Sequence, residues 1–287
     1  MFVVGVDGCR DGWVVVALEE GAFAGATQVA TFSEVLALTS DAAAVAVDMP
    51  IGFVERGERT CDILVREFIG PRRASVFIAP PRKALLEPSY NDANAECLRR
   101  AGFGLTKQLW NLKPKILEVE HALSEHHDNV KPGDSEAPPS SEVLSTRDVT
   151  AKNRGGYVQH GRLGEQPSAL RRFARVVVPD RRSSLPPLLG PRVIEVHPEA
   201  SFRQLAGDHL RASKKSYNGM MQRLELLSAA GIVLPKQLSI GRVAVDDVLD
   251  AAAAAWTANR HALGISRSMP GPELQERDGE RVIAIWV

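Results

Sequence analysis

Residues 1–16 read MFVVGVDGCRDGWVVV, and this stretch decides the fold. Its first part, Phe2 to Val6, is almost wholly apolar, which is typical of a strand covered on both faces of a sheet. Gly8 follows Asp7, where a tight turn needs a permissive backbone. The second apolar run, Trp13 to Leu18, predicts a strand that returns beside the first in a hairpin. The carboxylate of Asp7 should therefore leave the end of a central strand at the rim of the sheet.

A second buried strand ends in the same way. Residues 42–48 read AAAVAVD, and Met49-Pro50-Ile51-Gly52 break the run directly after Asp48. Ligand sites of open α/β sheets lie outside the carboxyl ends of the strands, so two strands that each end on an aspartate predict a site at that edge. The alternative is that Asp7 only hydrogen-bonds the backbone of its turn, as aspartates of Asp-Gly pairs often do.

Composition sets the limits within which this site must function. A chain of 287 residues is long enough for one large domain or two small ones. Hydrophobic residues make up 44% and the formal net charge is +0, so a positive field that gathers nucleic acid could only be local. The three cysteines lack paired spacing, which favours a reducing compartment such as the cytoplasm over a disulfide framework. The chain shows no basic-plus-apolar leader and no long apolar span, and we expect neither secretion nor membrane insertion.

The next segments predict a third antiparallel strand, then mainly helices and one loop. The strand is expected over Ala26–Phe32, and helices over Cys61–Phe68, Asn91–Ala101 and residues 107–123. Pro71–Arg82, PRRASVFIAPPR, is expected to be a loop held by its prolines.

Residues 126–190 differ from the rest in composition. Pro, Ser, Glu and Asp dominate their first part, and arginines their remainder. We expect a disordered or irregular insertion within a single domain of residues 1–287. It is either an unconstrained loop or a flexible nucleic-acid arm, and the near absence of aromatic residues favours the loop.

The C-terminal part is expected to return to the sheet and to supply more acids. Strands are predicted over Arg192–Val196, which carries Glu195, and over Val282–Trp286, and helices over Ser216–Ala230 and Val245–Ala262. The last of these helices opens with Asp246, Asp247 and Asp250.

These three acids exceed what helix capping requires. Asp247 and Asp250 stand three positions apart and share one face of the helix. The alternatives are that Asp246 is the N-cap and that the others offset the helix dipole. Repulsion among three acids is relieved best by a cation.

The acids together suggest a metal site. Carboxylate ligands without clustered Cys or His select Mg²⁺ or Mn²⁺. Two such ions, roughly 4 Å apart, can hold the attacking water and the leaving oxygen of a phosphodiester. Asp7 would bridge both ions, Asp48 would hold one, and Asp247 with Asp250 the other. Glu195 or Glu199 would add a ligand or a base, although the side chain of Glu195 is expected to face solvent.

Basic residues near this edge are candidates for binding substrate phosphates. They are Arg72, Arg73 and Arg82 in the proline-held loop and Lys215, with Lys214 and Tyr217, ahead of a helix. The alternative for the arginines is ordinary salt bridging on a solvated loop. His197 would shuttle a proton or simply hydrogen-bond at a strand end.

Six blocks of the sequence resemble an uncharacterised family of predicted RNase H-like nucleases, a domain of unknown function. The blocks are GVDGCRDGW, AVDMPIG, CDILVREFIGPRRASVFIAPPR, LWNLKPKILEVE, EVHPEASF and DDVLDAAAAAWTA. They span Met1 to about Leu123 and Arg192 to the end, and residues 126–190 depart from the pattern. The resemblance implies an α/β fold of the ribonuclease H type, with a five-stranded mixed sheet of three antiparallel and then two parallel strands, flanked by helices. The acids of that superfamily fall on Asp7, Asp48, and Asp247 with Asp250.

We therefore expect a divalent-metal-dependent nuclease, a hydrolase acting on RNA, DNA or a branched nucleic acid. One alternative is a nucleotide-binding phosphotransferase of the actin-like or sugar-kinase type, which also begins with a strand ending in Asp-Gly. That architecture needs a second such domain with its own glycine-rich phosphate loop, and none is evident. The other alternative is a catalytically inert binding module that keeps the fold and the acids.

Overall fold

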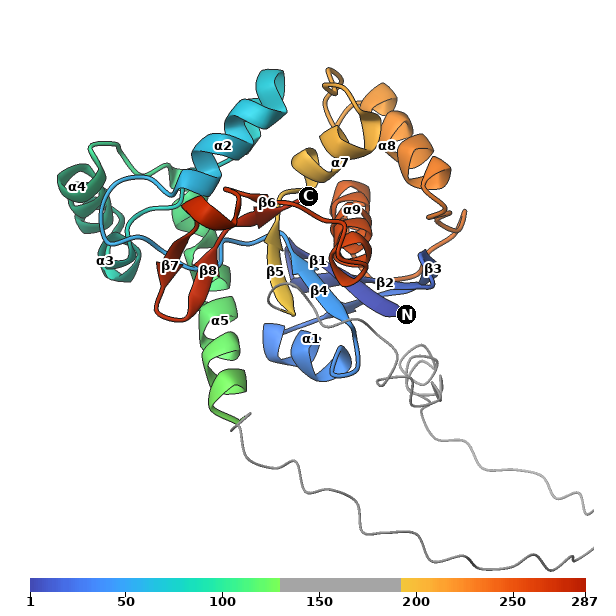
Figure 1. Ribbon diagram of the computed structural model, residues 1–287, viewed down its shortest axis with the longest axis horizontal. Coiled ribbons are helices and arrows are strands. Elements are labelled where there is room, and N and C mark those ends of the chain that lie inside the picture. Colours follow the sequence, from blue (N-terminus) through green and yellow to red (C-terminus); the bar gives the residue numbers. More distant parts are fainter. Residues whose placement is uncertain (130–191) are drawn as a thin grey trace, which may run out of the picture. The chain divides into compact units, whose positions relative to one another are not determined.

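The computed structural model of the protein describes residues 1–129 and 192–287 (Figure 1). Within these residues, seven strands form one sheet in the order β3-β2-β1-β4-β5-β9-β6. A separate ribbon pairs β7 with β8. The strand bounds are β1 Phe2–Cys9, β2 Gly12–Glu19, β3 Ala22–Val29, β4 Ala44–Val47, β5 Val193–Val196, β6 Ser268–Met269, β7 Glu276–Asp278, β8 Arg281–Ile283 and β9 Ile285–Trp286.

The sheet is mixed, as the sequence predicts. Strands β1, β2 and β3 are antiparallel neighbours, and β4, β5 and β9 continue from β1 in parallel. The expectation of five strands is wrong, because β9 and β6 extend the edge beyond β5. The third strand also begins four residues earlier than predicted, and the predicted strand Val282–Trp286 is broken at Ala284 into β8 and β9.

Helices flank the sheet. Their bounds are α1 Phe32–Leu38, α2 Thr60–Ile69, α3 Arg82–Leu86, α4 Tyr90–Ala101, α5 Lys107–Asn129, α7 Pro198–Ala206, α8 Tyr217–Ala229 and α9 Val245–Ala262, with 3-10 turns η1 Gly70–Ser75 and η2 Pro272–Leu274. The predicted loop Pro71–Arg82 thus contains most of η1 and ends where α3 begins. Apart from its first residues, which continue α5, the predicted insertion 126–190 lies outside the described residues.

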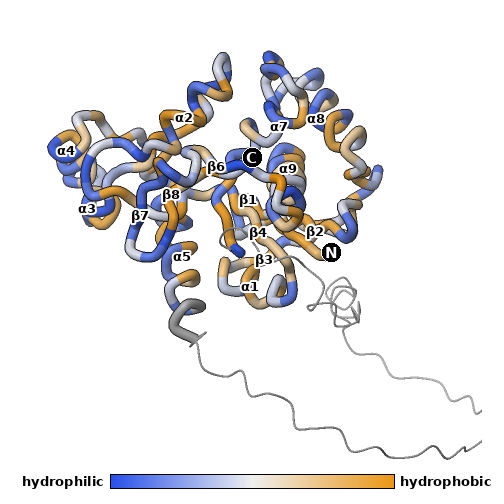
Figure 2. The backbone as a smooth tube through the Cα atoms, viewed as in Figure 1, coloured by the Kyte–Doolittle hydropathy of each residue, from blue (hydrophilic) through white to orange (hydrophobic). Residues whose placement is uncertain are grey.

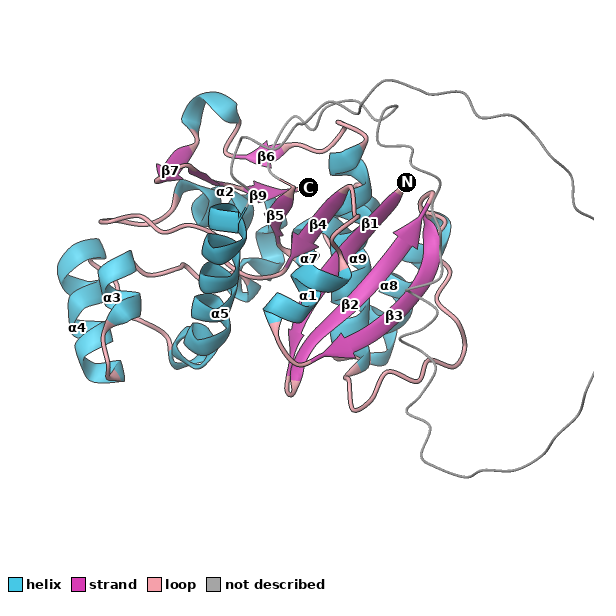
Figure 3. Cartoon of the chain, turned by 90° about the horizontal axis from the view of Figure 1, so that it is seen from below, coloured by secondary structure: helices cyan, strands magenta, loops and turns pink. Residues whose placement is uncertain are grey.

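The two faces of the sheet are covered by different helices (Figure 3). On one face α9 packs against β1, β2 and β4, and Val3, Val14 and Ile194 belong to this core. On the other face the ring of Trp13 meets Phe32 of α1 at a centroid distance of 5.1 Å, and its Nε1 donates to Glu118 of α5. Figure 2 shows the hydrophobic character of the central strands between these layers.

Helix α9 lies very close to β1 because both elements have small residues at the contact. Ala251 to Ala255 are fully buried. A Cβ atom on Gly5 of β1 would lie 2.7 Å from the Cα of Ala255 and would clash with the backbone of Ala251. Contact between backbones therefore fixes the height of α9 above the sheet and brings its first turns to the carboxyl end of β1.

None of the helices within residues 1–129 and 192–287 combines the length and the hydropathy that a bilayer-spanning helix needs.

Candidate metal centre

Because side chains alternate along the strands, Asp7 and Asp48 lie on the face of the sheet that α9 covers. Successive side chains of a strand point to opposite faces. Val3 packs in the core under α9, and Gly5 contacts α9 directly, so Asp7 follows on the same face. In β4, Ala44 and Ala46 pack in that core, and Asp48 follows them. Both carboxylates therefore emerge on the α9 side, where their parallel strands end.

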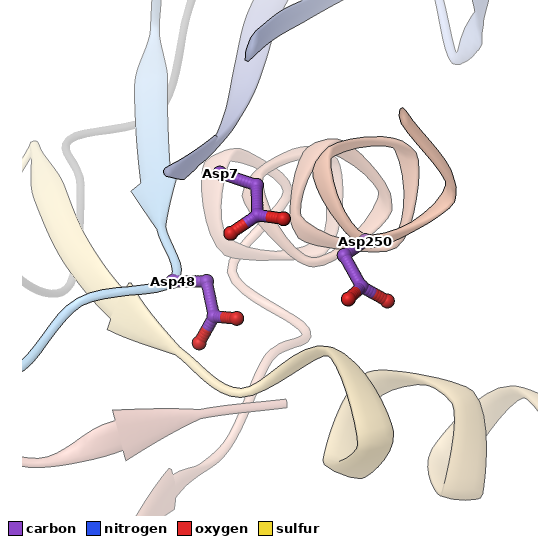
Figure 4. Close-up of side chains that lie close together, drawn as sticks. All are labelled: Asp7, Asp48 and Asp250. Atoms are coloured by element: carbon purple, nitrogen blue, oxygen red, sulfur yellow. The ribbon is translucent and has the colours of Figure 1, made fainter. Parts of the chain in front are cut away.

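The first turns of α9 supply a third carboxylate to this place. Oxygen atoms of Asp7, Asp48 and Asp250 all lie within 4.8 Å of one another. Figure 4 shows the three side chains together, each from a different element. Asp7 and Asp250 are buried, with 8% and 1% of their surface exposed, and Asp48 is partly buried. The convergence expected from the sequence is thus present for these three residues.

Burial and mutual repulsion make these carboxylates hard to ionise. Burial is the main cause that raises the pKa of Asp7 well above its usual value, and the charges of Asp48, Asp250 and Asp247 add to it. Burial also raises the pKa of Asp48 to about 7, against the opposing effect of Lys214. It raises the pKa of Asp250 to about 7, again opposed by Lys214 and reinforced by Asp48. A cation would relieve all three.

Lys214 also belongs to this site, beside Asp250. It lies between α7 and α8, and its Nζ donates to Oδ2 of Asp250 in an ion pair. Burial alone would lower the pKa of Lys214, but attraction to Asp250, Asp48 and Asp7 raises it overall. Lys214 is thus held as a cation beside the acids. No sequence spacing reveals this contact, because a loop places it.

The residues present fit a hard divalent cation. All the donor atoms are carboxylate oxygens, the type that Mg²⁺ and Mn²⁺ prefer. Oδ1 of Asp250 is buried and has no hydrogen-bond partner among the described residues. A buried oxygen of this kind costs about 1–3 kcal/mol when it is left unpaired. The cluster can therefore hold a metal ion.

Asp247 lies outside this group. It is half-buried in the first turn of α9, where burial, and then the charge of Asp246, raise its pKa. The described carboxylates that come together are those of Asp7, Asp48 and Asp250. The N-cap of α9 is Ala244, so the prediction that Asp246 caps this helix is wrong.

Glu195 points to the opposite face of its strand. Its neighbours Ile194 and Val196 pack in the core under α9, so the alternation sends Glu195 the other way. There it forms a buried ion pair with Arg59, with its Oε1 2.7 Å from Nη2, and its Oε2 accepts from the backbone N–H of Ile51 at 2.6 Å. Only 4% of Glu195 is exposed, so the expectation that it faces solvent is wrong.

Glu199 is also neutralised by an arginine. Nη2 of the buried Arg223 lies 2.7 and 2.8 Å from its two carboxylate oxygens. His197 lies nearby, with Nε2 3.3 Å from the carbonyl oxygen of Ser75 and Nδ1 buried without a described partner.

The basic residues predicted to bind phosphates have different surroundings. Arg82 forms ion pairs with Glu120 and Asp278, and Arg72 lies 3.9 Å from Glu199. Arg73 and Lys215 are exposed.

One cleft adjoins the carboxylates, and a larger cavity borders that cleft. A cleft of about 140 Å³ is lined by Asp7, Asp48 and His197, among others. Val76 and Phe77 line both this cleft and a larger open cavity of about 1040 Å³, which Arg73 also lines. Asp7 and Asp48 thus line a cleft that the end of η1 also borders.

The model of one protein family matches two segments of this chain, residues 5–139 and 135–275. The two matched segments contribute to one sheet, because β4 in the first pairs with β5 in the second. Searches among curated proteins and among solved structures found no match. The family match covers nearly the whole chain, which therefore belongs to DUF429, a family of proteins of unknown function.

Proposed function

We propose that the protein is a divalent-metal-dependent nuclease that hydrolyses phosphodiester bonds of RNA or DNA in the cytoplasm. The observation that carries this proposal is the meeting of three carboxylates, from the ends of β1 and β4 and from α9, with one oxygen of Asp250 buried and without a hydrogen-bond partner among the described residues. A purely structural role does not need such a grouping, since the charges of Asp48 and Asp250 raise the pKa of Asp7 and the charge of Asp48 raises the pKa of Asp250.

The strand arrangement supports a ribonuclease H-like fold. Strands β1 to β3 form an antiparallel meander, and β4 and β5 follow in parallel on the other side of β1. This is the arrangement that the resemblance to RNase H-like nucleases implies. The acids of that superfamily on the first strand, the fourth strand and the last helix correspond here to Asp7, Asp48 and Asp250.

The residues of the site would divide the work as follows. Asp7, Asp48 and Asp250 would hold Mg²⁺ or Mn²⁺. When bound, the metal supplies charge neutralisation at the phosphate and lowers the pKa of a water. Lys214 keeps Asp250 oriented through their ion pair. Arg59 neutralises Glu195 and Arg223 neutralises Glu199, so we assign these two glutamates a structural role rather than a metal-binding one.

The backbone of a substrate would approach along η1. Arg72 and Arg73 lie on this turn, and Ser75 and Val76 behind them line the cleft beside Asp7 and Asp48. Arg82 is held by two carboxylates, which favours salt bridging over phosphate binding for this residue. Lys215 is exposed next to Lys214 and is free to meet a phosphate at the other side of the site.

The proposal is tested by incubating the purified chain with single-stranded, double-stranded and branched RNA and DNA in Mg²⁺ or Mn²⁺. We expect cleavage that EDTA abolishes, and a loss of roughly a hundredfold or more in Asp7→Asn and Asp48→Asn, since even outer-shell changes at metal sites cost 10–100-fold. Asp11→Asn, at the exposed tip of the same hairpin, is the matched control and should keep full activity. Cleavage that survives Asp7→Asn would refute the site. Metal binding without cleavage of any substrate would favour an inert binding module.

A further inference from the structure

Lys214 places a fixed positive charge inside the carboxylate group. Its Nζ pairs with Oδ2 of Asp250, while Oδ1 of the same carboxylate is buried without a described partner. One oxygen of Asp250 is thus engaged by a side-chain cation and the other remains for a ligand.

The balance of charges then leaves room for one divalent ion. The three clustered carboxylates carry three negative charges when ionised, and Lys214 offsets one of them. A single divalent ion offsets the remaining two. The charge of Asp247 also acts on Asp7, but Asp247 is only half-buried and has the charge of Lys215 acting on it in turn. A second ion would leave an excess of positive charge in a largely buried place unless Lys214 moved away, and Asp247, expected to help hold that ion, lies outside the group.

The loop that carries Lys214 is built to hold it in place. The backbone of Ser213 lies so close to α8 that a Cβ atom on Gly219 would be 2.6 Å from its carbonyl carbon. Ser216 caps α8 and donates to the oxygen of Ser213 at 2.7 Å. Nη1 of the fully buried Arg223 donates to the oxygen of Gly219 at 2.9 Å and to that of Ala212 at 3.4 Å.

We propose that this site binds one divalent ion and that Nζ of Lys214 takes the place of a second. This inference rests on the metal centre of the proposed function but does not require that the protein cleave nucleic acid. It replaces the two-ion arrangement expected from the sequence with one ion and one lysine.

The test is the stoichiometry of Mn²⁺ binding to the full chain, measured by isothermal titration calorimetry at neutral pH. The wild type should bind one Mn²⁺ per chain. Lys214→Met keeps most of the side-chain stem but loses the charge, and should bind two. Lys214→Arg keeps the charge and should bind one. Lys236→Met, which removes an exposed lysine after α8 and away from the carboxylates, is the matched control and should also bind one. Thermal melts show whether each variant is folded. Lys214→Gln, which also lacks the charge and should bind two, carries the test if Lys214→Met does not fold.

Each outcome decides the matter. Two Mn²⁺ per wild-type or Lys214→Arg chain would overturn the role of Lys214 and leave the nuclease proposal standing. A folded Lys214→Met chain that still binds one Mn²⁺ would overturn it as well. A wild type that binds no Mn²⁺ would remove both this inference and the proposed function, whereas failure to cleave any nucleic acid would leave the stoichiometry unaffected.

Discussion

Asp7 is the residue at which the demands of stability and of metal binding oppose each other most. It is buried, and three other carboxylates raise its pKa, whereas the charge of Lys214 lowers it. Ionised at neutral pH without a bound cation, it destabilises the fold. With a cation it becomes part of the binding site.

We therefore predict that Asp7→Asn stabilises the metal-free chain. The change should raise the free energy of unfolding by at least about 1 kcal/mol at neutral pH, since one unit of pKa shift corresponds to about 1.4 kcal/mol. Mn²⁺ at a hundredfold excess over Kd should add about 2.7 kcal/mol to the wild type and nothing to the variant. Urea denaturation with EDTA or Mn²⁺ measures both effects. A metal-free variant less stable than the wild type would contradict the repulsion described here.

The raised pKa values also predict how stability depends on pH. Asp48 and Asp250 have pKa values of about 7 in the folded chain, above the pKa of an aspartate in the unfolded chain. Between the unfolded and the folded pKa, the folded state therefore binds more protons than the unfolded state. The free energy of unfolding of the metal-free protein should therefore fall as pH rises from about 4 to about 7. Burial raises the pKa of Glu195 to about 7 as well, which adds a contribution of the same sign.

Bound Mn²⁺ should reduce this fall, because it interacts with the ionised forms of Asp7, Asp48 and Asp250 but not with Glu195. Denaturation curves at pH 5 and pH 7.5, with EDTA and with Mn²⁺, check the prediction. A metal-free stability that rises over this range would exclude the raised pKa values.

For single residues, the sequence predicts which carboxylates follow a buried strand, but it does not predict which basic residues pair with the acids. Asp7 and Asp48 are recognisable because each follows an apolar run typical of a strand and precedes a turn. Strand periodicity also indicates that Glu195, between Ile194 and Val196, faces away from them. Its pairing with Arg59, and that of Lys214 with Asp250, depend on how loops fold back, which no local pattern encodes.

Among the elements, α9 and β1 form the pair that assembles the site. The sequence predicts the bounds of α9 correctly, because its run of alanines has the highest intrinsic helix propensity. It also indicates that small side chains would let this helix lie close to a sheet. It does not show that Gly5 is the point of contact, since a glycine within an apolar strand has several possible causes.

Gly5→Ala should separate these two elements. The added methyl group would meet the backbone of Ala251 and Ala255, which cannot rotate away, so we expect a loss of roughly 1–3 kcal/mol or more. The affinity for Mn²⁺ should fall with it, because Asp250 moves with α9. Urea denaturation and calorimetry measure the two effects. Gly271→Ala, where a Cβ would meet nothing, is the control, and equal effects at both positions would refute the close contact.

Over the whole described molecule, a buried ion network joins segments that are far apart in sequence. Arg59 pairs with Asp62 at 2.5 Å and with Glu195 at 2.7 Å, and donates to the carbonyl oxygen of Gly52. Asp62 in turn accepts from the backbone N–H of Ala79. The network thus ties α2, β5 and the loop after Asp48 to one another.

Arg59→Met should destabilise the protein by roughly 3–5 kcal/mol, because it leaves two buried carboxylates without their cation. Arg99→Met, which removes a surface pair with Glu96, should leave the stability nearly unchanged, because solvent screens exposed ion pairs. Chemical denaturation compares the two variants. Similar losses in both would show that the buried network contributes no more than a surface ion pair.

The arrangement of the whole sheet is predictable only in its first half. Strands β1 to β4 follow one another with short connections, and their apolar runs give their order. The pairing of β5 with β4 joins residues separated by a long segment of a different composition, and β6 and β9 are each two residues long. Two residues are too few to show a periodic signal, so β6 is not predicted and β9 is predicted only as part of a longer strand.

The position of α9 in the chain has a consequence for the timing of biosynthesis. Asp7 and Asp48 leave the ribosome early, while Asp250 follows Asp48 by about two hundred residues. Until that helix has been translated, the nascent polypeptide has two of the three ligands and an uncovered apolar face on its first strand. The protein therefore cannot acquire the site, or any chemistry that depends on it, until α9 has been synthesised.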